Sequence, residues 1–179
     1  WQAGTDIALG DLYANNEPFG LCSRGTVKRA VKDWESLGYF PFIGLETEAY
    51  IFQRDEDGIW RPYDTPGAFV YSTGPESDPK GVMDDIWEAA YAADIPIESM
   101  NGEFDNGQFE LTMKFDHAVK ACDDAFLMRT MAREIGLKKG LLLTFLPKPV
   151  PDRGGSGLHV NFSLKDKEVY LTGFVSIPI

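Results

Sequence analysis

Residues 101–110 read NGEFDNGQFE, and the Asn106-Gly107 pair near their centre is a strong signal for a two-residue β-hairpin turn. A type I′ turn at this pair places Glu103 directly opposite Glu110, with their Cβ atoms about 5 Å apart. Two ionised carboxylates at that distance repel each other by roughly 3 kcal/mol at an effective dielectric of about 20. The pair is therefore well solvated, protonated on one member or bridged by a cation, and these residues alone leave the three interpretations open.

The composition is that of a globular, acidic chain. Its 179 residues suffice for one ordinary domain or for part of a larger one. The chain carries 17 Lys and Arg against 28 Asp and Glu, and the net charge of −11 argues against nucleic acid or an anionic membrane as a partner. The sequence has no basic run and no long apolar run, so we expect neither a targeting peptide nor a spanning helix. Cys22 and Cys122 stand without a CxxC motif, which fits a reducing cytoplasm and thiols that fill the core.

Hydrophobic periodicity predicts helices and strands on both sides of the hairpin. Helices are expected at residues 23–37, 78–93 and 116–136, and the residues predicted to start them are Ser23, Asp78 and Asp116. Buried strands are expected at residues 41–52, 141–146 and 158–164. No internal repeat or low-complexity linker divides the chain.

Polar side chains gather on one face of two of these strands. Glu46 and Glu48 emerge about 7 Å apart among aromatic neighbours, where they need a counter-charge unless the strand end dips into solvent. In the strand at residues 158–164, the polar residues that share one face are His159, Asn161 and Ser163. A glycine-rich loop, residues 154–157, precedes this strand. The polar face either faces solvent or lines a site where a ligand approaches the backbone.

Together these strands present several carboxylates and one imidazole. Such a set is typical of a hard divalent ion, Mg²⁺ or Mn²⁺, rather than of zinc held by thiolates. The spacing favours two ions over one, and paired metals usually serve phosphate chemistry by clamping and neutralising the transferred group. A mechanism that needs several imidazoles is excluded, because the sequence has only His117 and His159.

Four motifs resemble, in their order and spacing, those of the glutamine synthetase catalytic domain. They are GLETE at residues 44–48, the hairpin segment that ends in GQFE at residues 107–110, TFLPKP at residues 144–149 and GSGLH at residues 155–159. The resemblance runs from about residue 5 to about residue 165. Each motif alone is weak, but the joint match is highly specific.

This resemblance implies roles for individual residues. The ligands expected for the metal beside the glutamate substrate are Glu48, Glu103 and Glu110. The ligands expected for the metal that handles the ATP phosphates are Glu46 and His159.

The resemblance also implies binding positions for the substrates. Gly155 and His159 are expected in the amino-acid pocket, and Asn161 and Ser163 are expected near the nucleotide. No side chain is assigned a catalytic role, because the protein in such a mechanism mainly positions groups and stabilises charge.

The fold implied by the resemblance is α+β: a curved antiparallel sheet with helices outside and carboxylates on its inner face. We expect residues 1–165 to form an incomplete glutamine synthetase-like catalytic domain and residues 166–179 to be a tail of unassigned character. The N-terminal β-grasp domain and the later segments of the family have no counterpart in this chain. Because the family's active site forms between neighbouring subunits, we expect a homo-oligomeric ring.

The implied reaction is an ATP-dependent ligation that uses Mg²⁺ or Mn²⁺. ATP phosphorylates the γ-carboxylate of glutamate, and ammonia or an amine then attacks the acyl phosphate. Three departures from the family pattern put ammonia in doubt and make a larger amine credible: Ala49 for a common Phe, Asn101-Gly102 for a frequent His-His, and Gly154 for the usual Asn. The alternatives are a non-catalytic structural or regulatory descendant of the family and a metal-dependent phosphohydrolase.

Overall fold

The computed structural model describes residues 1–166 and 175–178, and a single long strand organises it. This strand, β3 (Phe40–Arg54), is rich in β-branched and aromatic residues, which favour extended backbone. Its antiparallel partners are β4 (Trp60–Pro62), β6 (Gln108–Met113), β7 (Asp116–His117), β8 (Leu141–Thr144) and β9 (Leu158–Lys165). Segments from most of the chain therefore meet along β3.

Two further strands widen the sheet. β5 (Ile97–Gly102) pairs with β6, and β10 (Val175–Pro178) pairs with β9. A separate two-stranded ribbon, β1 (Tyr13–Ala14) and β2 (Glu17–Pro18), lies near the N-terminus. Of the expected tail, residues 167–174 and 179 lie outside the described part of the chain.

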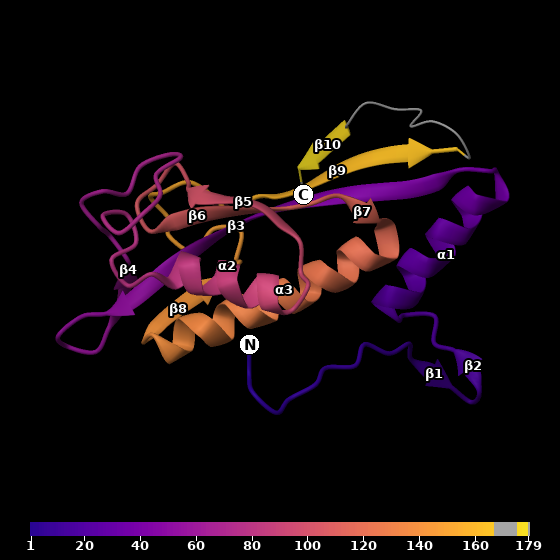
Figure 1. Ribbon diagram of the computed structural model, residues 1–179, viewed down its shortest axis with the longest axis horizontal. Coiled ribbons are helices and arrows are strands. Elements are labelled where there is room, and N and C mark those ends of the chain that lie inside the picture. Colours follow the sequence, from indigo (N-terminus) through magenta and orange to yellow (C-terminus); the bar gives the residue numbers. More distant parts are fainter. Residues whose placement is uncertain (167–174, 179) are drawn as a thin grey trace.

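In the described part of the chain, three helices lie on the same side of the sheet, as Figure 1 shows: α1 (Ser23–Ser36), α2 (Val82–Ala92) and α3 (Ala118–Lys138). α3 packs against β3 and β8, while α1 and α2 pack against α3. The helices found in the described residues are too short or too polar to cross a membrane. An antiparallel sheet with helices along one face confirms the predicted α+β class.

The core lies between β3 and the helices. Residues of the strands that point toward α3, such as Ala49, Leu111 and Leu143, are at most 1% exposed, and Met128 and Ala132 of α3 are fully buried against them. The opposite face of β3 carries Glu46 and Glu48, which are half-buried. The alternation along the strand therefore separates an apolar face from an acidic one.

The predicted starts of the helices need correction. Cys22, not Ser23, is the N-cap of α1, and its sulfur accepts a hydrogen bond from the Gly25 N–H. α2 begins only at Val82, because Gly81 adopts a φ of 62° ahead of it. The Asp78 carboxylate still reaches the helix, since Met83 N donates to its Oδ2 at 2.7 Å.

The long helix also begins later than predicted. Asp116 and His117 pair with Ile43 and Phe42 as β7, so α3 begins at Ala118. Pairing along the edge of β3 thus extends the sheet by two residues at the expense of the helix.

Candidate metal centre

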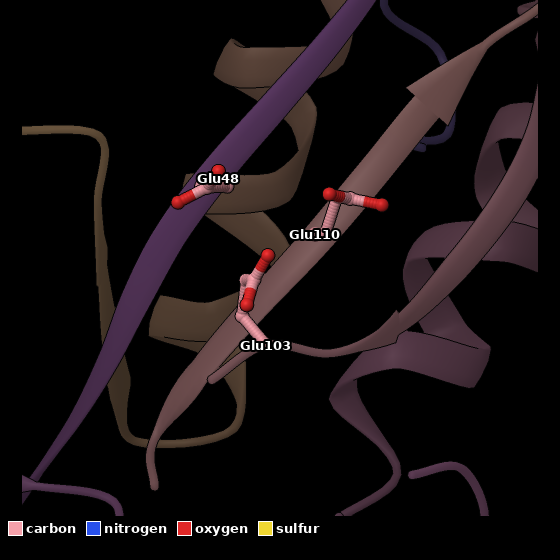
Figure 2. A group of neighbouring side chains, drawn as sticks. All are labelled: Glu48, Glu103 and Glu110. Carbon is pink, nitrogen blue, oxygen red and sulfur yellow. The ribbon is translucent and has the colours of Figure 1, made fainter. Parts of the chain in front are cut away.

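Three carboxylates from different parts of the chain come together on the acidic face of the sheet. Glu48, Glu103 and Glu110 each offer an oxygen, and these oxygens all lie within 4.8 Å of one another. Figure 2 shows the three side chains directed toward a common space in front of the strands, with helix behind. The predicted metal ligands beside the glutamate position therefore form one group.

The sheet register fixes two of the three side chains. Glu48 of β3 lies directly opposite Glu110 of β6, and Asn101 of β5 flanks Glu110 on its other side. Residues directly opposite each other in an antiparallel pair have Cβ atoms about 5 Å apart. The close approach of these two carboxylates is thus a consequence of strand pairing.

Glu103 reaches the group by another route. It lies in the loop after β5, where its N–H donates to the Gln108 carbonyl at 3.0 Å. The Glu103 carboxylate accepts a hydrogen bond from the N–H of Phe104. The third carboxylate therefore stands on a loop beside two that stand on strands.

The predicted hairpin register is wrong, although the predicted meeting of Glu103 and Glu110 is correct. Gly102 pairs with Phe109, and residues 103–107 connect β5 to β6, so the turn is longer than two residues. Asn106 also lacks the positive φ that a type I′ turn requires. The Asn106 amide is instead engaged with Thr65, whose N–H donates to its Oδ1 at 2.9 Å and whose carbonyl accepts from its Nδ2 at 2.8 Å. These tertiary contacts override the local turn preference.

The group of carboxylates is electrostatically strained. Burial, reinforced by Glu46 and by the two other members of the group, raises the pKa of Glu110 to about 7. Burial also raises the pKa of Glu103 above its usual range. Within the described residues, no lysine or arginine forms an ion pair with Glu48, Glu103 or Glu110. Among the residues that the structure describes, the group therefore shares negative charge with no lysine or arginine paired to it.

These features fit a hard divalent cation. The donors are oxygens, they come from three carboxylates, and their mutual repulsion would be relieved by a cation between them. Mg²⁺ and Mn²⁺ prefer such ligands, whereas zinc sites of the thiolate type need cysteines. Cys22 and Cys122 are both free and lie outside the group.

The second predicted pair of ligands also meets. Glu46 of β3 is paired in register with His159 of β9, and their Oε1 and Nδ1 atoms are 2.6 Å apart. The hydrogen bond that the His159 ring donates to the Glu46 carboxylate when protonated raises the pKa of His159. Glu46 and Glu48 share a face of β3, so this pair lies next to the group of three carboxylates.

A glycine-rich loop closes over both sets of side chains. The Glu48 N–H donates to the Gly157 carbonyl at 3.0 Å. A Cβ on Gly157 would lie 2.9 Å from Glu48 Oε1 and 3.0 Å from His159 Nε2, so a side chain there would displace the ends of these two side chains. The loop backbone therefore passes close to both candidate metal positions.

Side chains outside the predicted set hold this loop. Arg153 forms a two-pronged ion pair with Asp64 and also donates to the Asn106 carbonyl. The Tyr50 hydroxyl donates to the Gly154 carbonyl at 3.0 Å, and the Asp105 carboxylate accepts from the Gly154 N–H. Burial, with the nearby Asp105 charge, raises the pKa of Tyr50 to about 12.

The predicted nucleotide residues lie farther along β9. Asn161 pairs with Gly44, and the buried Ser163 pairs with Phe42, so both share the face of His159. Each step of two residues moves about 7 Å along a strand. The structure thus aligns them with His159 without bringing them to the three carboxylates.

Sequence reasoning gave no role to Gln108 or Asp105. Both lie in the hairpin stretch, and both contact the glycine-rich loop. The sequence places Gln108 directly after Asn106-Gly107, but it does not predict the contact of its amide with a loop more than 40 residues away in sequence. Only the folded chain reveals them.

Comparison with known proteins gives consistent matches. The sequence model of the family described as "Glutamine synthetase, catalytic domain" matches residues 20–172. A glutamate–isopropylamine ligase of a Pseudomonas species is 33% identical over 93% of this chain, and a glutamine synthetase of Pyrococcus woesei is 30% identical over 92%.

A solved structure titled as Plasmodium falciparum glutamine synthetase superposes with a TM-score of 0.76 at 20% identity, over 88% of this chain and 36% of that one. Its likeness concerns the fold. The chain spans only 38% and 37% of the length of the two curated relatives.

Proposed function

This chain belongs to the glutamine synthetase catalytic-domain family, and we propose on that basis that it forms part of an ATP-dependent ligase acting on glutamate. The proposed ligase transfers the γ-phosphoryl group of ATP to an oxygen of the glutamate γ-carboxylate, which yields ADP and an acyl phosphate. Ammonia or an amine then attacks the acyl carbon, phosphate leaves and the attacking nitrogen loses a proton. The product is a γ-amide of glutamate.

The observation that carries the proposal is the group formed by Glu48, Glu103 and Glu110. Mg²⁺ or Mn²⁺ held by these residues would neutralise charge next to the reacting carboxylate, and a second ion held by Glu46 and His159 would do so at the phosphates. The His159 ring is already oriented by Glu46, as expected for an imidazole whose second nitrogen serves as a ligand.

The chain's own groups would position the substrates. We assign the backbone around Gly155, with His159, to the amino acid, and Asn161 and Ser163 to the nucleotide. The glycine-rich loop supports this assignment, because a Cβ on its Gly157 would come within 3.0 Å of both Glu48 and His159. Positioning and charge stabilisation supply most of the rate in phosphoryl transfer.

The acceptor is ammonia or an amine. A relative named for joining glutamate to isopropylamine matches this chain over 93% of its length. Gly154 also departs from the family pattern, and Asp105 occupies the space that a Cβ there would enter. The relative and the departure at Gly154 favour an amine larger than ammonia.

We propose that residues 1–165 are one part of the catalytic unit and that the complete enzyme is a homo-oligomeric ring. The chain spans less than two-fifths of its curated relatives, so other segments of the assembly would complete the site. The free thiols of Cys22 and Cys122 support a cytoplasmic location.

Isothermal titration with Mn²⁺ tests the metal centre. Wild type should bind Mn²⁺, Glu103→Ala should bind it at least about ten-fold more weakly, and the matched control Glu98→Ala should bind it like wild type. Glu98 is suitable because its exposed side chain lies on β5, outside the group. Equally weak binding by wild type and Glu103→Ala contradicts the proposal and favours a non-catalytic relic.

A turnover assay on the full-length oligomer tests the reaction. ADP formation should require both glutamate and an amine, and a panel from ammonium to isopropylamine identifies the acceptor. ATP hydrolysis that does not depend on glutamate contradicts the ligase and indicates a metal-dependent phosphohydrolase.

A further inference from the structure

Gln108 occupies a junction between the carboxylate group and the glycine-rich loop. The residue is only 5% exposed, and its Nε2 donates to Glu48 Oε2 at 3.1 Å and to the Gly155 carbonyl at 2.9 Å. A primary amide has two N–H donors, and here each donor has its own acceptor. The side chain therefore contacts both a candidate metal ligand and the loop assigned to the amino acid.

The backbone of Gln108 is fixed as well. Its N–H donates to the Asp105 carbonyl at 3.0 Å, and its carbonyl accepts from the Glu103 N–H at 3.0 Å. Gln108 is also the first residue of β6 and lies opposite Tyr50 of β3. One residue thus holds Glu103 through its main chain and Glu48 through its side chain.

Glutamine suits this position for a chemical reason. A carboxylate at position 108 would add a fourth negative charge beside Glu48, whereas a lysine would compete with a bound cation. An apolar residue would leave both Glu48 and the Gly155 carbonyl without this donor. A neutral donor with two N–H groups orients the carboxylate and leaves its charge available.

From these contacts we infer that Gln108 is a positioning residue, which aligns the Glu48 carboxylate for a divalent cation and couples that alignment to the loop that receives the amino acid. The inference rests on the proposed function for the identity of the amino acid, glutamate. The alignment of the metal ligand by Gln108 depends only on its hydrogen bond to Glu48. Residues that hydrogen-bond to metal ligands commonly change metal affinity by about 10–100-fold when removed.

The test compares Gln108→Met with Tyr50→Phe. Gln108→Met keeps an unbranched side chain of similar length but removes both donors. Tyr50→Phe removes a different loop anchor, the hydroxyl that bonds the Gly154 carbonyl, without touching Glu48. Gln108→Asn serves as a second variant, since it stays polar but is too short to reach both acceptors.

Mn²⁺ affinity and the KM for glutamate are measured for each full-length variant after circular dichroism has established folding. Both Gln108 variants should bind Mn²⁺ about ten-fold or more weakly, broaden the Mn²⁺ electron paramagnetic resonance spectrum and raise the glutamate KM. Tyr50→Phe should raise only the KM. A folded Gln108 variant with wild-type Mn²⁺ affinity overturns the inference.

The two proposals fail in different ways. If wild type binds Mn²⁺ but turns over ATP without glutamate, the ligase proposal fails while the Mn²⁺ titration still decides the role of Gln108. If glutamate-dependent turnover is present and the Gln108 variants bind Mn²⁺ normally, only the inference about Gln108 fails.

Discussion

β3 shows two unlike faces built from alternate residues of one strand. Toward the helices, Leu45, Ala49 and Ile51 are 8%, 0% and 4% exposed and belong to the core. Toward the other side, Glu46 and Glu48 are half-buried and carry charges that burial disfavours. The helix-covered face stabilises the fold, and that stability allows the acidic face to hold carboxylates that oppose folding.

The strongest test of this comparison uses Leu111 and its neighbour Glu110, which point to opposite faces of β6. Leu111 is fully buried, so Leu111→Ala should lower the free energy of unfolding by about 2–5 kcal/mol. Urea denaturation in the presence of EDTA measures this loss. Mn²⁺ affinity of the folded variant should stay within about two-fold of wild type, and a large loss of affinity would show that the two faces are not separable.

Glu110→Gln should have the opposite effect on stability. The Glu110 carboxyl has a folded pKa of about 7 against an ordinary value of 4.5, so the folded state holds this proton to higher pH than the unfolded state. Wild type without metal should therefore lose stability as the pH rises from about 4.5 to about 7. The variant, which has no charge to bury, should be more stable than wild type by about 1–2 kcal/mol at pH 8.

Thermal or urea unfolding across pH measures this difference, which should grow through the stated window and then level off. The same variant should bind Mn²⁺ at least about ten-fold more weakly, because it lacks one of three carboxylates. A Glu110→Gln protein that is less stable than wild type at pH 8 would contradict the assignment of electrostatic strain to this face.

A smaller effect is expected where the glycine-rich loop approaches the acidic face. The Cβ of Gly157→Ala would press on Glu48 and His159 and should weaken Mn²⁺ binding by roughly ten-fold, with little change in unfolding. Gly20→Ala is the matched control, because a Cβ there meets no atom within 4 Å. Equal Mn²⁺ affinities in the two variants would show that the loop can yield.

The sequence predicts which residues of a strand share a face better than it predicts which strands lie next to each other. Alternation alone placed Glu46 with Glu48 and His159 with Asn161, because the period of a strand is two residues. The contact between Glu46 and His159 joins residues 113 positions apart, and strand periodicity carries no information about which strands pair. The family motifs supplied that link.

The hairpin shows where local rules fail. Asn106-Gly107 favours a type I′ turn, but Thr65 binds the Asn106 amide and Ser72 binds the backbone of Gly102. These partners lie in a loop that has no secondary-structure signal. Glu103 still meets Glu110, because the loop after β5 brings Glu103 to the side of the sheet that carries Glu110. The pairing of β3 with β6 brings Glu48 to the same place.

The central place of β3 has a further consequence during synthesis on the ribosome. β3 leaves the ribosome before its partner β9, which follows about 110 residues later and so after roughly 10 s of translation. For that time the part of β3 that pairs with β9, Phe40–Thr47, lacks its final partner along one edge, a state in which strands pair with other chains. Glu46 and Glu48 interrupt the apolar run with charge. Charged residues within such a run disfavour pairing with other chains, so the residues proposed to bind metal in the folded protein would also act against aggregation of the nascent strand.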